Sequence, residues 1–112
     1  MREITASELS KILKEHKRWT DTDGGEGEEA NLRGANLIDA DLSGATLSNA
    51  NLYRADLREA DLRRADLGGV YLREADLRKA DLSGTSLFKA KMTCANLSNV
   101  NLSNADLSGA YL

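Results

Sequence analysis

The chain has 112 residues, a formal net charge of −3 and an aromatic content of 4%. This length suits one domain, and so few aromatic side chains exclude a wide core filled by large rings. A single cysteine excludes an intramolecular disulfide and is typical of a reducing compartment, so we expect a cytoplasmic protein. Residues 1–20 contain no apolar run of signal-peptide type, and no segment has the length of a membrane span.

The first predicted element is an amphipathic α-helix from Ala6 to near Trp19. Thr5 precedes Glu8 by three residues, which is the spacing of a capping box at a helix start. Apolar residues then recur at helical spacing along one side of the helix. The predicted apolar side comprises Leu9, Ile12, Leu13 and Trp19.

We expect this helix to cover one end of the repeats that follow, because terminal repeats expose both a core and strand edges. His16, the only histidine, falls on the apolar side, where a packing role is favoured over catalysis. The alternative is a helix that lies on a membrane, which its Lys, Arg and Trp content would suit. Glu8 and Glu15 weaken that signal, so no membrane partner is expected.

Residues 21–29 predict a linker, because they contain three glycines and five acids. This composition disfavours packed structure. Asp21, Asp23 and Glu26 could suggest a metal loop, but the twelve-residue calcium-loop pattern is absent and a solvated turn is favoured. We therefore divide the chain into residues 1–29, the helix with its acidic Gly-rich linker, and residues 30–112, and we expect no metal or cofactor.

From Ala30 to Leu112 an apolar residue recurs at every fifth position, 17 times in succession. The residue two places earlier is Ala in 14 of these units, and the residue just before is Asp or Asn in 12. The interior members of the series, which we predict to form the core, are Leu37, Leu42, Leu47, Leu52, Leu57, Leu62, Leu67, Leu72, Leu77, Leu82, Leu87, Met92, Leu97, Leu102 and Leu107.

A period of five fits neither an α-helix, which turns every ~3.6 residues, nor a flat strand, whose faces alternate every two. A coil that bends once in each unit turns every Ala and Leu inwards and the other three positions outwards. The Asp or Asn before each Leu is then predicted to bond a backbone amide at the bend. The repeats therefore predict a narrow tube of stacked coils.

Units such as Ala35-Asn36-Leu37 and Ala55-Asp56-Leu57 resemble those of the pentapeptide repeat family. The resemblance implies an all-β solenoid, a right-handed quadrilateral β-helix with four units and so 20 residues per coil. It implies about four coils here, and the general rule that solenoid ends are covered adds the first helix as an N-terminal α-helical cap. Residues 20 apart would then stack in four columns.

The outward positions of residues 51–81 carry seven bases interleaved with seven acids. A balanced mixture of this kind is typical of a soluble surface that resists sideways aggregation, and this interpretation is favoured over a docking face. Phe88 also falls outwards, beside lysines. The candidate partner residues are Arg54, Arg58, Arg63, Arg64, Arg73, Arg78 and Phe88.

The sequence contains no catalytic triad, phosphate loop or metal-spaced cluster, so we expect no enzyme activity. Two function classes remain. The first is a non-catalytic scaffold or interaction module for an unidentified protein, with no nucleic acid as partner. The second follows from the resemblance: some relatives mimic DNA, bind DNA gyrase and protect it from quinolones. Residues 30–112 hold ten acids and ten bases, so their net charge is zero. DNA mimicry needs an electrostatic field of one sign, and the scaffold is therefore favoured. Exposed edges at the last coil also predict a homodimer through the C-terminal coils, and the alternative is that ends this narrow tolerate exposure to water.

Overall fold

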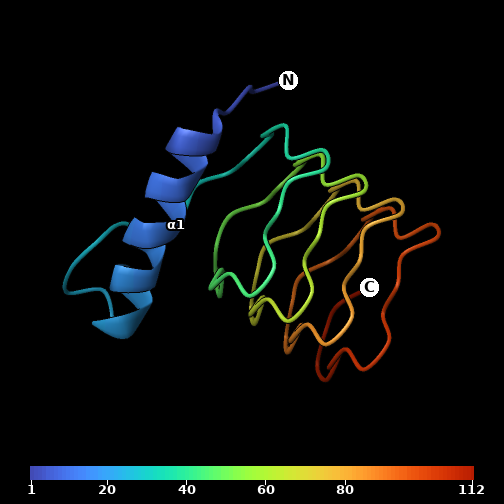
Figure 1. The fold of residues 1–112 in the computed structure, drawn as a ribbon. Helices are drawn as coiled ribbons and strands as arrows, with labels where there is room; N and C mark the ends of the chain where they lie inside the picture. The colour runs from blue at the N-terminus through green and yellow to red at the C-terminus, as the bar shows by residue number, and fades with distance from the viewer.

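The computed structural model describes all 112 residues as one helix, α1 (Ala6–Asp21), followed by a stack of rectangular coils (Figure 1). The molecule measures 36 × 29 × 21 Å along its principal axes. Helix α1 lies across one end of the stack, and the C-terminus lies at the opposite end (Figure 1). No helix combines the length and apolar character that crossing a bilayer requires.

The coils are held together by single-residue parallel bridges, so no longer strand forms. Each bridge from residue 31 onwards joins residues 20 apart, such as Asp41 with Asp61 and Asp61 with Asp81. The backbone N–H of Leu62 donates to Asp81 in the next coil at 2.8 Å, while that of Asp61 donates to Ala40 in the previous coil at 2.9 Å. Four five-residue units therefore complete one coil, as the family resemblance implies.

The register gives the solenoid four faces, each made of one unit from every coil. We number the faces in chain order. The first face holds units that start at Asn31, Asn51, Tyr71 and Lys91, the second at Asn36, Asp56, Asp76 and Asn96, the third at Asp41, Asp61, Asp81 and Asn101, and the fourth at Thr46, Asp66, Ser86 and Asp106.

Every corner uses the same turn. The carbonyl of each apolar centre from Leu32 to Leu107 accepts a hydrogen bond from the backbone N–H three places on, as Leu62 does from Ala65 at 3.1 Å. The third residue of the turn is left-handed, with φ between 58° and 70°, as in a type II turn. All 12 Asp and Asn residues before a Leu accept the backbone N–H two residues on, as predicted.

The core is the column of Leu and Ala side chains along the tube axis. The predicted residues from Leu37 to Met92 are buried, and Thr85, which replaces an Ala, is also buried and donates its hydroxyl to the carbonyl of Leu62 at 2.7 Å. The last coil differs from the prediction. Leu97, Leu102 and Leu107 are only partly buried, because a coil covers them on one side and not on the other.

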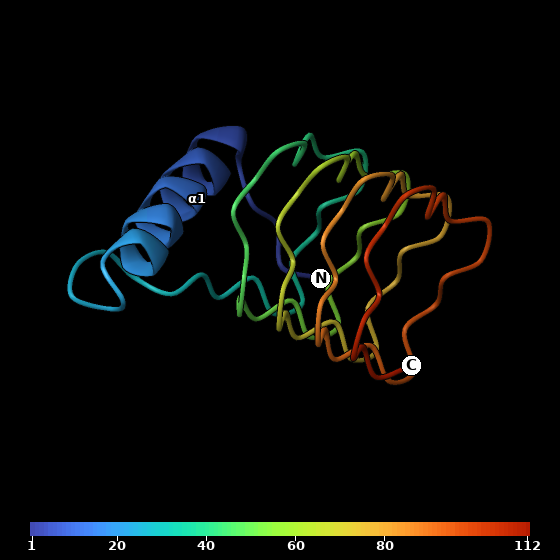
Figure 2. The ribbon, with the colours of Figure 1, turned by 90° about the horizontal axis from the view of Figure 1, so that it is seen from below.

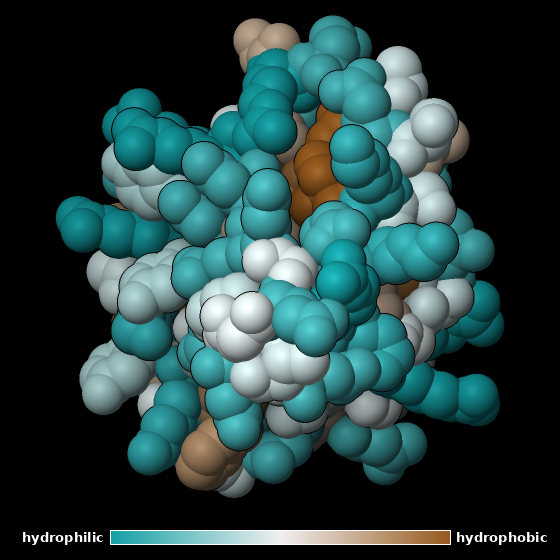
Figure 3. All heavy atoms as spheres, turned by 90° about the vertical axis from the view of Figure 1, so that its left-hand side faces the viewer, coloured by the Kyte–Doolittle hydropathy of each residue, from teal (hydrophilic) through white to brown (hydrophobic).

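Helix α1 begins where the sequence predicts and ends two residues later. Thr5 and Glu8 form the predicted capping box, in which each side chain bonds the other residue's backbone N–H. Ile4, Leu9, Ile12 and Leu13 pack against the core of the solenoid, so the apolar side of α1 faces the first coil (Figures 1 and 2). The outer side of this end is mostly hydrophilic (Figure 3).

Trp19 does not join the predicted apolar contacts, whereas His16 is buried, as a packing role predicts, and also makes two polar contacts. Trp19 is partly buried and stacks on the His16 ring, with centroids 5.4 Å apart, and is not among the residues that pack on the core. His16 is fully buried, and its Nδ1 accepts the backbone N–H of Ala30 at 2.8 Å. Its Nε2 lies 2.7 Å from the carbonyl oxygen of Ser48, so it must carry the proton. His16 therefore joins α1 to two coil segments by polar bonds.

The predicted linker is a solvated turn that is also hydrogen-bonded to α1. The hydroxyl of Thr22 donates to the carbonyl of Arg18 at 2.7 Å and accepts the N–H of Glu26 at 2.9 Å, which folds the segment back on α1. Gly27, with φ of 76°, lies so close to Glu15 that a Cβ there would collide with the carbonyl oxygen. Residues 22–27 form turns and bends, and all but Gly27 are exposed, so the predicted solvated turn is confirmed, while the close approach that glycine permits was not predicted.

A single-residue bridge at the N-terminus was not predicted. Arg2 forms a parallel bridge with Ala35, and its carbonyl accepts the N–H of Asn36 at 2.7 Å. Residue 2 therefore supplies part of the backbone pairing that the first coil lacks from a preceding coil.

Candidate interaction surface

The structure sorts the ten acids and ten bases of the repeats unequally among the four faces. The second, third and fourth faces each carry one more acid than base. The first face carries four bases and one acid, so its side-chain charge is +3 against −1 for each other face. The charged residues of the first face are Arg33, Arg54, Arg73, Lys91 and Glu74. The repeats therefore have no net charge in total, but one of their four faces is basic.

On the second and third faces, the Asp before a Leu holds the Arg after it. Asp61 accepts hydrogen bonds from Nε and Nη2 of Arg63 at 2.8 and 2.6 Å, and Arg58 and Arg78 bind Asp56 and Asp76 in the same way. The Arg63 guanidinium lowers the pKa of Asp61 from 3.8 to about 2. These arginines are engaged with their own unit and have less capacity to bind a partner.

The predicted partner residues do not form one surface. Arg54 and Arg73 lie on the first face, while the remaining members are spread over the other three. The second face holds Arg58 and Arg78, the third Arg63 and Arg64, and the fourth Phe88. Phe88 is 47% exposed, as its outward position predicts, and Lys89 lies over its ring at 5.2 Å.

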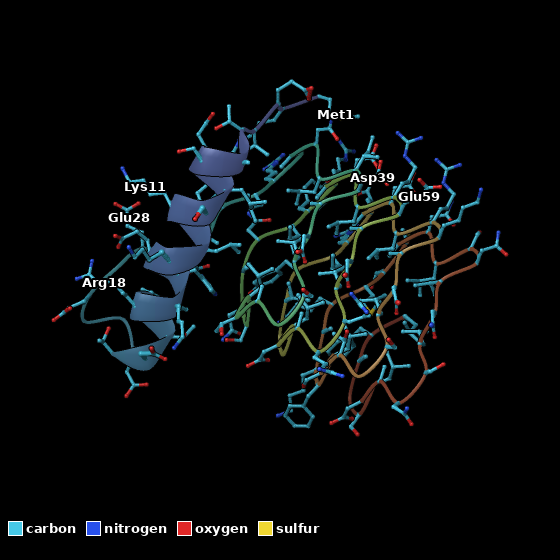
Figure 4. The ribbon with its side chains drawn as sticks, viewed as in Figure 1. Met1, Lys11, Arg18, Glu28, Asp39 and Glu59 are labelled. Carbon is cyan, nitrogen blue, oxygen red and sulfur yellow. The ribbon has the colours of Figure 1, made fainter.

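Corner positions also stack from coil to coil. Asp39 and Glu59 occupy the same turn position in consecutive coils and lie along one edge of the solenoid (Figure 4). Lys11, Arg18 and Glu28 lie on the side of α1 that faces away from the coils (Figure 4). No three His, Cys, Asp or Glu side chains gather in a metal-binding arrangement, and His16 makes the two backbone contacts described above.

A model of pentapeptide repeats matches residues 28–64, 55–93 and 83–112, with eight copies. The chain belongs to the pentapeptide repeat family. The solved pentapeptide repeat structures include a protein from the Arabidopsis thaliana thylakoid lumen, which is 42% identical over 70% of this chain with a TM-score of 0.69. They also include Rfr23 from the cyanobacterium Cyanothece 51142, which is 38% identical over 70% of this chain with a TM-score of 0.56. No curated protein matches the sequence.

These relatives imply a right-handed quadrilateral β-helix for the coils. The chain covers 54% of the Arabidopsis protein and 56% of Rfr23, so it spans about half the length of these pentapeptide repeat proteins. The family explains the Leu and Ala columns and the turn geometry. It does not explain which side chains occupy the outward positions, and those positions decide what the surface can bind.

Proposed function

We propose that this pentapeptide repeat protein is a non-catalytic scaffold that binds another protein through its outward faces. The main observation behind this proposal is that the positions within each five-residue unit have different structural roles. Ala and Leu build the core, Asp or Asn holds the turn, and the two positions after each Leu remain free to vary. A repetitive core with variable outer positions is how solenoid proteins present extended binding surfaces.

A non-catalytic role is supported by the state of the groups that catalysis would need. His16 is the only imidazole, and both of its nitrogens are engaged by backbone groups. The aspartates carry lowered pKa values where Arg or Ser side chains bond them, as in Asp61 and Asp41, which favours charged structural groups over proton donors.

We also propose that α1 serves as the N-terminal cap, which its apolar contacts support. A cytoplasmic location remains a proposal from cysteine content. Pairing of the last coil with a second copy of the chain is proposed as well, because the backbone N–H groups of Leu97, Leu102 and Leu107 donate to no carbonyl in the structure. Light scattering over a range of concentrations tests this pairing: a dimer mass is expected, and a monomer mass at the highest concentration would reject it.

The alternative function, a DNA-mimicking gyrase binder, has less support from the surface. Such mimicry requires acids that dominate a continuous face. Here three faces differ from neutrality by a single charge, and the first face is basic. We expect no protection of gyrase in a supercoiling assay with a quinolone present, and clear rescue by the folded protein would favour the alternative.

Photo-crosslinking from each face tests the scaffold proposal. Benzoylphenylalanine would replace one exposed residue at the same unit position on each face, in cells that express the protein. The matched positions are Thr93, Ser98, Ser103 and Ser108. Discrete crosslinked protein bands from at least one face are expected. Absence of such bands from all four faces would reject a protein-binding role.

A further inference from the structure

The first face differs from the others in the residue that precedes each Leu. On the second and third faces, Asp56, Asp61 and Asp76 each hold the arginine two residues on. On the first face this position is filled by Asn31, Asn51, Tyr71, Lys91 and Tyr111, and no Asp occurs there. The arginines of this face therefore have no carboxylate in their own unit just before the Leu, and Arg33 makes no ion pair at all.

The single acid of the first-face units is already paired with neighbouring side chains. Glu74 accepts a hydrogen bond from the Tyr53 hydroxyl at 3.0 Å and pairs with Arg54 at 3.3 Å. The Tyr53 hydroxyl, followed by the Arg54 charge, lowers the pKa of Glu74, so this group stays charged and bound to its neighbours. Arg33 and Lys91 are left without a carboxylate partner, and Arg73 approaches Glu74 only to 4.0 Å.

All three tyrosines of the protein lie on this face, among its cations. Tyr71 is 44% exposed and Tyr111 is 61% exposed. An open hollow crosses the helix-proximal half of the face and is lined by Glu29, Arg33, Asn51, Tyr53, Tyr71 and Arg73. Tyr and Arg are enriched at the centres of protein interfaces, where they contribute much of the binding energy.

We infer that the first face binds an acidic, extended segment of a partner protein, whose carboxylates pair with Arg33, Arg73 and Lys91. The units of the face carry a charge of +3. Glu29, which also lines the hollow, lowers this charge by one to +2, which still selects an acidic partner. Coils lie about 4.8 Å apart, so Arg33 and Arg73 are separated by about 10 Å along the axis. A peptide in the extended polyproline II conformation turns once in three residues and rises about 3.1 Å per residue, so its carboxylates three residues apart share one side at a spacing of about 9 Å.

The geometry favours a protein over a single-stranded nucleic acid. Bases bind such surfaces by stacking on open aromatic rings. Here Arg33 and Arg54 lie 4.9 and 5.2 Å from the centre of the Tyr53 ring, and Lys91 lies 4.4 Å from that of Tyr71. These cations already occupy the space over the rings, while their charges remain available to carboxylates.

The test measures fluorescence anisotropy of a dye-labelled oligoglutamate peptide at low salt. We expect binding that weakens as salt rises, and a loss of affinity of at least about tenfold in the double variant Arg33→Glu/Arg73→Glu. The matched control is Arg64→Glu/Lys79→Glu. It changes the net charge by the same amount as the first-face variant, but on the third and second faces. Both control positions tolerate Glu in the left-handed turn, since Glu59 and Glu74 occupy it. The neutral pair Arg33→Gln/Arg73→Gln provides a second variant with a smaller electrostatic change.

The control variant is expected to stay within a few-fold of the wild type. Equal weakening in both charge-reversal variants would show a net-charge effect and overturn the inference, as would absence of binding at low salt. Tighter binding of single-stranded oligothymidylate than of oligoglutamate would overturn the choice of partner. The inference rests on the proposed scaffold function, but the two can fail separately: crosslinks from Ser98, Ser103 or Ser108 without any from Thr93 would reject this face and leave the scaffold role intact.

Discussion

Truncation of Leu62 tests whether the stacked coils supply the stability of the fold. Leu62 is fully buried, and the bridges between Asp41, Asp61 and Asp81 hold a coil on each side of it. Because these coils are fixed by backbone hydrogen bonds, the space left by Leu62→Ala has little freedom to collapse. We therefore expect a loss of about 3–4 kcal/mol in the free energy of unfolding.

Leu102 belongs to the same column but is partly exposed, with a coil on one side only. Leu102→Ala should cost about 1–2 kcal/mol, because less apolar surface is removed and the last coil opens more easily. Arg63→Ala, at a side chain that is 57% exposed, should change stability little. Urea denaturation followed by circular dichroism measures all three. Equal losses at Leu62 and Leu102, or a loss at Arg63 as large as that at Leu62, would refute the stacked-column argument.

Three further predictions concern the helix end and the turns. His16→Phe keeps an aromatic ring, somewhat larger than imidazole, but leaves two backbone groups unpaired, so α1 should detach at lower urea, detected by Trp19 fluorescence before the circular dichroism changes. Asp61 has a folded pKa of about 2, below its ordinary 3.8, so its charge stabilises the fold above about pH 4 and this contribution is lost as pH falls towards 2. Asp61→Asn should therefore show a smaller fall in melting temperature over that range, and an unchanged fall would contradict the assignment. Gly27→Ala should destabilise by about 1–3 kcal/mol, clearly more than Gly34→Ala, where φ is also positive but an added Cβ would meet nothing; equal melting temperatures would reject the clash.

The regular parts of the fold were predictable because each depends on residues close together in the sequence. The capping box needs only Thr5 and Glu8, and each turn needs only the five residues of its unit. The burial of Leu37 to Met92 follows from their period, since a coil that bends once per unit turns all of them inwards. Partial exposure of Leu97 and the other last-coil leucines depends on the number of neighbouring coils, which the period alone does not give.

The contacts that the sequence did not reveal join segments through a shared position in space. Gly27 can approach Glu15 only after α1 and the segment behind it are placed, and composition alone indicated a solvated linker. Arg2 pairs with Ala35 across 33 residues, and a single bridge leaves no periodic pattern to detect. His16 was correctly placed on the apolar side of the helix, but its two backbone partners, Ala30 and Ser48, lie far from it and from each other in the sequence.

The charge pattern shows why a surface of this kind requires the three-dimensional register. Along the sequence, acids and bases alternate closely enough that residues 51–81 look balanced. The register of 20 residues sorts the same side chains by face, and only then does a unit without Asp before its Leu recur in every coil of the first face. Asp61 pairs with Arg63 in its own unit. In a unit that has no Asp before the Leu, an arginine at the position of Arg63 has no such partner and is available to another protein. In this fold the residue before the Leu therefore has two effects: it stabilises the turn, and it sets whether the next outward arginine is engaged or free.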